Sequence, residues 1–185
     1  MSWRSAAARA LAATLLLAAL AGCGFRPLYG TRSTDPVVMQ ELAGIYIKPI
    51  PDRQGQLVHN ALLVRLNPSG EPRDPRYRLD VTVGASESQV ALQQDNTASR
   101  DEVTYNVSYL LFSGDQLVTT GSFSRQFSFD FLPQQYANIS ARADVARRSA
   151  DEIADEIRNR MAAYFARAAQ ARAAASSAPQ APASQ

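Results

Sequence analysis

Three stretches of the chain alternate between apolar and polar residues. The alternation is clearest over residues 76–83, and it recurs over residues 100–112 and 117–131. A strand that buries one face and turns the other face away from the core has this period of two. The residues Ser113 to Gln116 predict a hairpin turn between the last two strands. A shorter run at residues 42–50 is rich in isoleucine and predicts one more strand before them.

A period of three to four residues marks two helices. The first is predicted over residues 52–66, with Asp52 as its N-cap, and the second over residues 140–168, with Ser140 as its N-cap. The order is strand, helix, three strands, helix. Because each element has one apolar side, we expect an α+β two-layer sandwich in which two helices pack on one face of a four-stranded mixed sheet.

The other face of the predicted sheet stays uncovered, and it is poor in charge over two neighbouring strands. Its residues are small or amide-bearing: Thr104, Asn106, Ser108, Ser122, Ser124, Gln126 and Ser128. In the first interpretation these residues only contact water, because antiparallel sheets tolerate a solvated face. A second interpretation is a contact face for a polar wall of another protein. The sequence alone leaves both interpretations open.

The first 22 residues predict a secretory signal peptide, because Arg4 and Arg9 precede a short apolar run that ends in small residues. The run from residue 10 to residue 21 is shorter than the roughly 20 residues that cross a bilayer. It leads to Cys23, the only cysteine of the chain. Leu-Ala-Gly-Cys at this point resembles the bacterial lipobox, which implies cleavage before Cys23 and lipid on its sulfur. The alternative is an ordinary signal peptide followed by a buried cysteine.

Composition divides the precursor into four parts. We expect a signal peptide at 1–22, a lipid anchor and tether at 23–40, one α/β domain at 41–168 and a disordered tail at 169–185, where alanine, serine and proline prevail. The chain has 19 basic and 17 acidic residues, and two arginines leave with the signal peptide. The mature protein is therefore close to neutral, which argues against a nucleic-acid partner.

No constellation of catalytic or metal-binding residues stands out. His59 is the only histidine and falls within the first predicted helix, where a surface or boundary position explains it. Carboxylates such as those of Asp101 and Glu102 are adjacent in sequence and diverge on a regular element. We expect no metal, no cofactor and no enzymatic activity, and the chain is interpreted as a binding or assembly protein.

Residues Cys23 to Gly30, CGFRPLYG, are similar to the start of the mature LptE family of lipopolysaccharide-assembly lipoproteins. Weaker similarity covers residues 95–112 and 127–165, within a match of roughly 12–166. The resemblance implies two helices against a four-stranded sheet. It also implies a lipoprotein that plugs a large outer-membrane barrel of the LptD family, helps that barrel assemble and assists the delivery of lipopolysaccharide. Gly24 after the cysteine favours the outer membrane, because lipoproteins retained in the inner membrane carry aspartate there.

The family resemblance also implies that basic residues near one end of the sheet bind lipopolysaccharide. Arg100 is the first candidate, since a guanidinium can form two hydrogen bonds with a phosphate. Arg76 and Arg78 are further candidates, and an exposed loop arginine is the alternative for Arg100. The alternative function is a periplasm-facing outer-membrane lipoprotein that regulates a cell-wall synthase or serves an ABC-type lipid transporter. The short tether, about 20 residues after Cys23, favours a domain held near the membrane.

Overall fold

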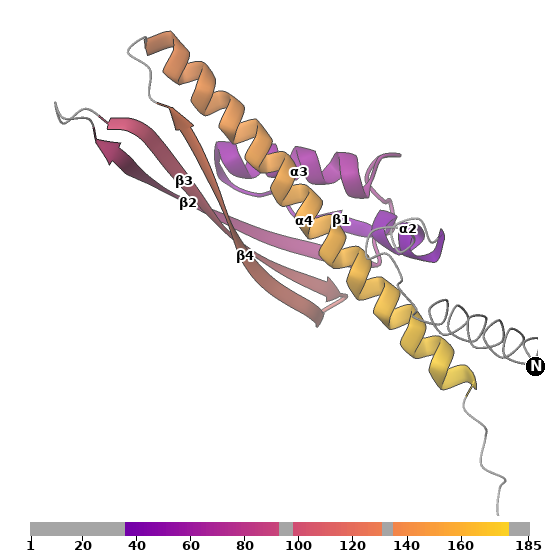
Figure 1. The fold of residues 1–185 in the computed structure, drawn as a ribbon. Helices are drawn as coiled ribbons and strands as arrows, with labels where there is room; N and C mark the ends of the chain where they lie inside the picture. Colours follow the sequence, from indigo (N-terminus) through magenta and orange to yellow (C-terminus); the bar gives the residue numbers. More distant parts are fainter. Residues whose placement is uncertain (1–35, 93–97, 131–134, 178–185) are drawn as a thin grey trace, which may run out of the picture. The chain divides into compact units, whose positions relative to one another are not determined.

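A computed structural model describes residues 36–92, 98–130 and 135–177 (Figure 1). The chain divides into residues 1–31 and 32–185, and all described elements belong to the second unit. In chain order these elements are α2 (Pro36–Ala43), β1 (Ile45–Ile47), α3 (Asp52–Leu66), β2 (Tyr77–Leu92), β3 (Ala98–Ser113), β4 (Gln116–Asp130) and α4 (Gln135–Ser177).

The four strands form one mixed sheet in the order β1-β2-β3-β4. Strand β1 runs parallel to β2, with Ile45 beside Tyr77, and the other neighbours are antiparallel. The β3–β4 hairpin turns through Gly114, whose φ of 58° lies in the left-handed region that glycine adopts without strain. The predicted fold class, a two-layer α+β arrangement of a four-stranded mixed sheet and helices, is confirmed. The described residues form three helices rather than the predicted two, because α2 precedes β1.

The core lies between the inner face of the sheet and the helices (Figure 1). Alternate residues of the strands supply one side of it, and one stripe of each helix supplies the other. The fully buried large side chains are Val38, Ile45, Ile47, Val58, Leu62, Leu66, Leu79, Val107, Leu111, Ile153, Ile157 and Met161. The alternation and the helical periodicity seen in the sequence therefore correspond to the buried positions.

Polar contacts join α3 to α4 at both ends of α3. The Gln54 side-chain amide donates hydrogen bonds to the Ala146 carbonyl at 3.2 Å and to the Ser149 hydroxyl at 3.0 Å. At the other end, Arg65 bridges Asp151 at 3.1 Å and also bonds Asp155. The hydrogen bond that Arg65 donates to the Asp155 carboxylate raises the pKa of Arg65 above its ordinary value. These contacts fix the position of α3 along α4.

The structure differs from the sequence prediction in the segment before β1. Residues 36–40, which the sequence placed in the tether, form the first part of α2. The predicted strand over residues 42–50 is reduced to Ile45–Ile47, because Leu42 belongs to α2 and is buried. Glu41 of α2 pairs with Arg76 at 3.5 Å and with Arg172 of α4 at 3.8 Å. Packing and charge thus hold α2 against the rest of the domain.

The ends of the helices also differ from prediction. Helix α3 spans 52–66 as predicted, but its N-cap is Pro51, which makes no side-chain cap hydrogen bond, and Asp52 is the first helical residue. Helix α4 begins at Gln135 rather than after Ser140, and it continues to Ser177. Residues 169–177 of the predicted disordered tail are therefore helical, consistent with the high helix propensity of alanine. The remaining residues, 178–185, lie outside the described part.

Candidate functional site

The uncharged face predicted from the sequence is one continuous surface on β3 and β4. In the register of the hairpin, Thr104 lies beside Gln126, and the pairs Asn106–Ser124 and Ser108–Ser122 follow. Ser128 continues the row on β4, opposite Glu102. All of these positions point away from the buried face; Thr104 is half-buried and the others are exposed. We call the seven predicted residues, at positions 104, 106, 108, 122, 124, 126 and 128, the outer polar face.

Strand β2 extends the outer polar face on one side. Thr82 lies beside Ser108, Gly84 beside Asn106 and Ser86 beside Thr104. The Ser86 hydroxyl donates a hydrogen bond of 3.4 Å to the Thr104 carbonyl. The surface is thus three strands wide, and none of its central side chains is charged. Hydroxyls and amides donate and accept hydrogen bonds, so such a surface can match a polar wall of varied composition.

The character of the same face changes toward the β3–β4 turn. Leu110 is 39% exposed and Leu117 is 47% exposed. Arg78 lies over the ring of Phe112, with 4.6 Å from the guanidinium carbon to the ring centroid, and contacts Asp80 at 3.4 Å. The uncharged polar character is therefore confined to the middle of the sheet, since Glu102 lies on the same face toward the other end.

The structure does not bring the three candidate arginines together. Arg78 opposes Phe112 in the β2–β3 register, whereas Arg100 lies twelve residues earlier on β3. At a rise of about 3.4 Å per residue the separation along the strand is about 40 Å. Arg76 pairs with Glu41 and lies at the same end as Arg78. A lipopolysaccharide site that includes Arg100 therefore cannot also include Arg76 and Arg78.

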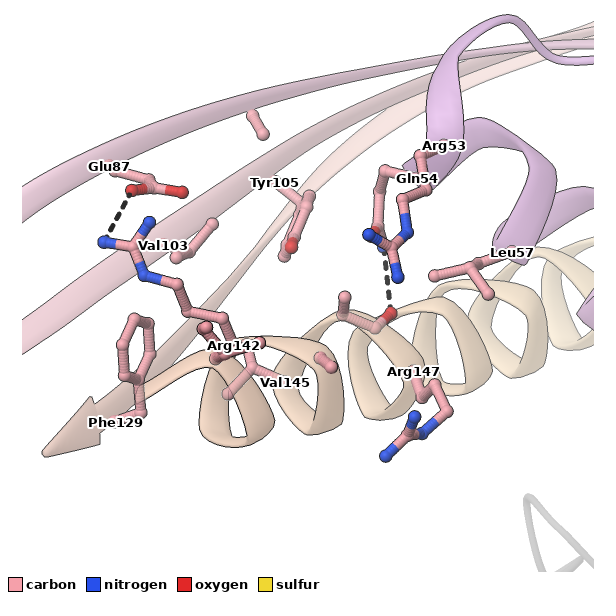
Figure 2. Close-up of a pocket in the computed structure, with 14 residues that line it drawn as sticks. Arg53, Gln54, Leu57, Glu87, Val103, Tyr105, Phe129, Arg142, Val145 and Arg147 are labelled. Atoms are coloured by element: carbon pink, nitrogen blue, oxygen red, sulfur yellow. Dashed lines mark hydrogen bonds and ion pairs between the residues drawn. The ribbon is translucent and has the colours of Figure 1, made fainter. Parts of the chain in front are cut away.

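A pocket that the sequence did not predict lies on the inner side of the sheet, near the end where Arg100 is found. Its volume is about 530 Å³, and it lies between β2, β3 and β4, the start of α3 and the first turns of α4 (Figure 2). Its lining is mostly apolar. The apolar lining residues are Leu57, Ala85, Val103, Tyr105, Phe129, Ile139, Ala143, Val145 and Ala146, and the polar ones are Arg53, Gln54, Glu87, Arg142 and Arg147.

Two arginines flank this pocket in different ways. Arg142 of α4 bonds the buried Asp101 at 3.3 Å, contacts Glu87 at 3.6 Å and lies 5.7 Å from the Phe129 ring centroid. Arg53 is exposed at the second position of α3, and within the described part of the chain it has no hydrogen-bond or ion-pair partner. In Figure 2 the labelled Arg142 and Arg53 lie on opposite sides of Tyr105.

The structure describes the position of His59 but not that of Cys23. His59 is half-buried on α3, with Nε2 3.3 Å from the Ile47 carbonyl oxygen, which accords with the expected boundary position. Cys23 lies outside the described residues. Among the described residues, no cluster of three or more His, Cys, Asp or Glu side chains could hold a metal ion. In the same part of the chain, no helix combines the length and apolar character needed to cross a bilayer.

Comparison with solved structures gives relatives of the same fold. A lipoprotein from Caulobacter crescentus CB15 is 26% identical, with a TM-score of 0.58, and the match covers 70% of this chain and 95% of that one. Rare lipoprotein B from Shewanella oneidensis is 15% identical, with a TM-score of 0.51 over 64% of this chain and 93% of that one. Lipoprotein B from Nitrosomonas europaea is 11% identical, with a TM-score of 0.52 over 66% and 83%.

Sequence comparison identifies the family. No curated protein sequence matches this chain. The sequence model of the family described as LptE, lipopolysaccharide-assembly, matches residues 42–161. The match runs from the end of α2 to the middle of α4 and includes the outer polar face and the pocket. The chain belongs to the LptE lipopolysaccharide-assembly family.

Proposed function

We propose that this protein is a noncatalytic outer-membrane lipoprotein, anchored through Cys23, that sits as a plug in an LptD-like β-barrel. In this role it helps the barrel assemble and assists the delivery of lipopolysaccharide to the outer leaflet. The observation that carries the proposal is the outer polar face of β3 and β4, which β2 extends with uncharged residues to a width of three strands. Membership of the lipopolysaccharide-assembly family supports it.

The chemistry of the outer polar face suits the interior of a membrane barrel. The lumen of such a barrel is polar, while its outer surface is apolar. Removing a hydroxyl or amide from water costs little when a hydrogen-bond partner replaces the water, whereas an unpaired charge costs far more. A surface of serine, threonine, asparagine and glutamine therefore loses little when it docks on a polar wall.

Lipopolysaccharide contact is assigned to Arg100 rather than to Arg76 or Arg78. Arg100 is exposed and is the third residue of the long strand β3, next to the buried Asp101. A guanidinium in this place can form paired hydrogen bonds with a phosphate group. Arg76 and Arg78 lie at the opposite end of the sheet, where Arg78 pairs in register with Phe112.

Site-directed crosslinking tests the plug. A photoreactive residue replaces Ser108 or Ser124 on the outer polar face, and a control carries it at Asn60, which is exposed on α3. The tagged protein is purified from outer membranes after irradiation, and crosslinked chains are identified by mass spectrometry. We expect a large β-barrel to be crosslinked from Ser108 and Ser124, and less from Asn60.

Two results would contradict the plug. Crosslinks to a barrel from Asn60 alone would show that the helical side makes the contact and that the outer polar face faces water. Purification without any barrel, but with a cell-wall synthase or an inner-membrane transporter, would favour the alternative function.

A further inference from the structure

The pocket between the inner sheet face and α4 is separate from the outer polar face. We propose that it binds one acyl chain of an anionic, phosphate-bearing lipid, with the phosphate at the N-terminus of α3 beside Arg53. The inference deepens the proposed role in lipopolysaccharide transport and rests on it for the identity of the lipid. The pocket itself does not depend on the barrel, because its lining belongs wholly to this chain.

The interior of the pocket is suited to hydrocarbon. Val103, Tyr105 and Phe129 project from the strands toward α4, where Val145 faces them (Figure 2). Ile139 lies 61% exposed among the lining residues, so apolar surface continues from the interior to the solvent. The volume, about 530 Å³, falls within the range typical of ligand pockets, roughly 300–1,000 Å³. The apolar majority of the lining therefore favours a hydrocarbon chain in the interior.

The charge needed for an anionic head group lies at one side of the pocket. Arg142 is held by Asp101 and Glu87, so its charge is already balanced. Arg53 has no such partner among the described residues, and it lies in the first turn of α3. The N-cap of that helix, Pro51, makes no side-chain hydrogen bond. Backbone N–H groups at a helix N-terminus attract anions, but the Asp52 carboxylate in the same first turn offsets that attraction. The guanidinium of Arg53 is therefore the group that would hold the phosphate.

The two surfaces can be used at the same time, because they lie on opposite faces of the sheet. Side chains of β3 alternate, so Val103 and Tyr105 face the pocket while Thr104 and Asn106 face outward. A barrel wall on the outer polar face therefore leaves the pocket open on its own side. In this arrangement the domain holds a lipid chain while it is docked.

Isothermal titration calorimetry tests the pocket. The probe is dodecyl phosphate below its micellar concentration, added to the full mature chain carrying Cys23→Ser, which needs no detergent. We expect one saturable site, weaker binding of the uncharged dodecyl maltoside, and no comparable binding of inorganic phosphate alone. Added salt should weaken the binding of dodecyl phosphate, because the head group contact is near the surface.

Paired variants locate the site. Arg53→Gln should weaken dodecyl phosphate about tenfold, since it removes a hydrogen bond to a charged group. Ala143→Phe should abolish binding by filling the pocket. The matched controls are Arg73→Gln, an exposed arginine outside the pocket, and Ala171→Phe, an exposed alanine near the end of α4, and both should bind as the parent does.

Several results would overturn the pocket proposal. They are no binding by the parent, equal binding of dodecyl maltoside or inorganic phosphate, unchanged binding by Arg53→Gln, and unchanged binding by folded Ala143→Phe. Circular dichroism checks that Ala143→Phe folds. If it does not fold, Arg53→Gln still decides, because Arg53 is exposed and packs no core. Copurification of the barrel with the Arg53→Gln variant separates the two proposals. Whether the barrel copurifies tests the plug, whereas the calorimetry tests the pocket.

Discussion

Gly55, in the first part of α3, offers a prediction whose sign depends on the structure. Replacing a helical glycine by alanine ordinarily stabilises a helix by about 1 kcal/mol. Here a Cβ at residue 55 would lie 2.6 Å from Ile50 Cγ2 and 3.0 Å from both the carbonyl carbon and oxygen of Ile50. Carbon atoms in ordinary contact are about 3.5–4.0 Å apart, so α3 or the preceding loop must move by roughly 1 Å.

The free energy of the clash exceeds the gain in helix propensity. Forcing one extra methyl group into a packed site costs about 1–3 kcal/mol. Ile50 is only 5% exposed, and its backbone is part of the contact, so the upper half of that range applies. We expect Gly55→Ala to lower the free energy of unfolding by about 1–2 kcal/mol after the propensity gain is subtracted. For a chain of this size the melting temperature falls by about 2–8 °C.

Urea unfolding followed by circular dichroism measures this difference. The midpoint should fall while the slope with urea stays unchanged, because the surface exposed on unfolding is the same. Gln56→Ala is the matched control: Gln56 is exposed one residue further along α3, and its replacement should change stability by less than about 0.5 kcal/mol. A Gly55→Ala protein as stable as the parent, or more stable, would refute the steric argument.

Three further predictions concern other parts of the chain. Burial, and after it the Glu41 carboxylate, raises the pKa of Tyr77. The protonated Tyr77 side chain therefore adds stability below about pH 10, and this stability is lost as the pH rises through the pKa of the folded state. Tyr77→Phe should therefore lose less stability than the parent between about pH 9 and about pH 11 in urea unfolding. Arg100→Asp should weaken lipopolysaccharide binding at least about tenfold, while Arg73→Asp should not; equal affinities would remove Arg100 from the site. Cys23→Ala should abolish incorporation of labelled palmitate, and a lipidated variant would disprove the anchor.

The elements that could be predicted from the sequence carry their own periodicity. Helix α3 has the predicted bounds because its apolar stripe ends at Asn67-Pro68. The long strands alternate around their buried residues at positions 77–83, 101–111 and 122–129. Helix α2 could not be predicted in this way. Its eight residues bury only Val38 and Leu42, and a helix of that length is unstable in water without tertiary contacts. Its stability comes from packing on α4, which the local sequence does not reveal.

The outer polar face could be predicted because it follows from the alternation of apolar and polar residues along β3 and β4. One-sided alternation places Asn106 and Ser124 on the same face as soon as β3 and β4 form a hairpin. Antiparallel pairing of β2 with β3 places Arg78, at the start of β2, beside the end of β3, whereas Arg100 lies near the start of β3. This separation could have been predicted from the residue numbers. The interaction of Arg142 with Asp101 joins α4 to β3 across 41 residues, and no local pattern signals it.

The pocket has a geometric origin that also explains why the sequence did not reveal it. Helix α3 packs on β1 and β2, whereas α4 packs on β4. Neighbouring strands are about 4.8 Å apart and a helix with its side chains is about 10 Å wide, so one helix cannot cover three strands. Beyond the start of α3, α4 alone covers the sheet, and small residues such as Ala143 and Ala146 face the space that remains. Each lining residue looks like an ordinary core position by itself. The apolar space forms because α4 extends along the sheet beyond the start of α3. Arg53 lies at the side of this space because it is in the first turn of α3, the shorter helix.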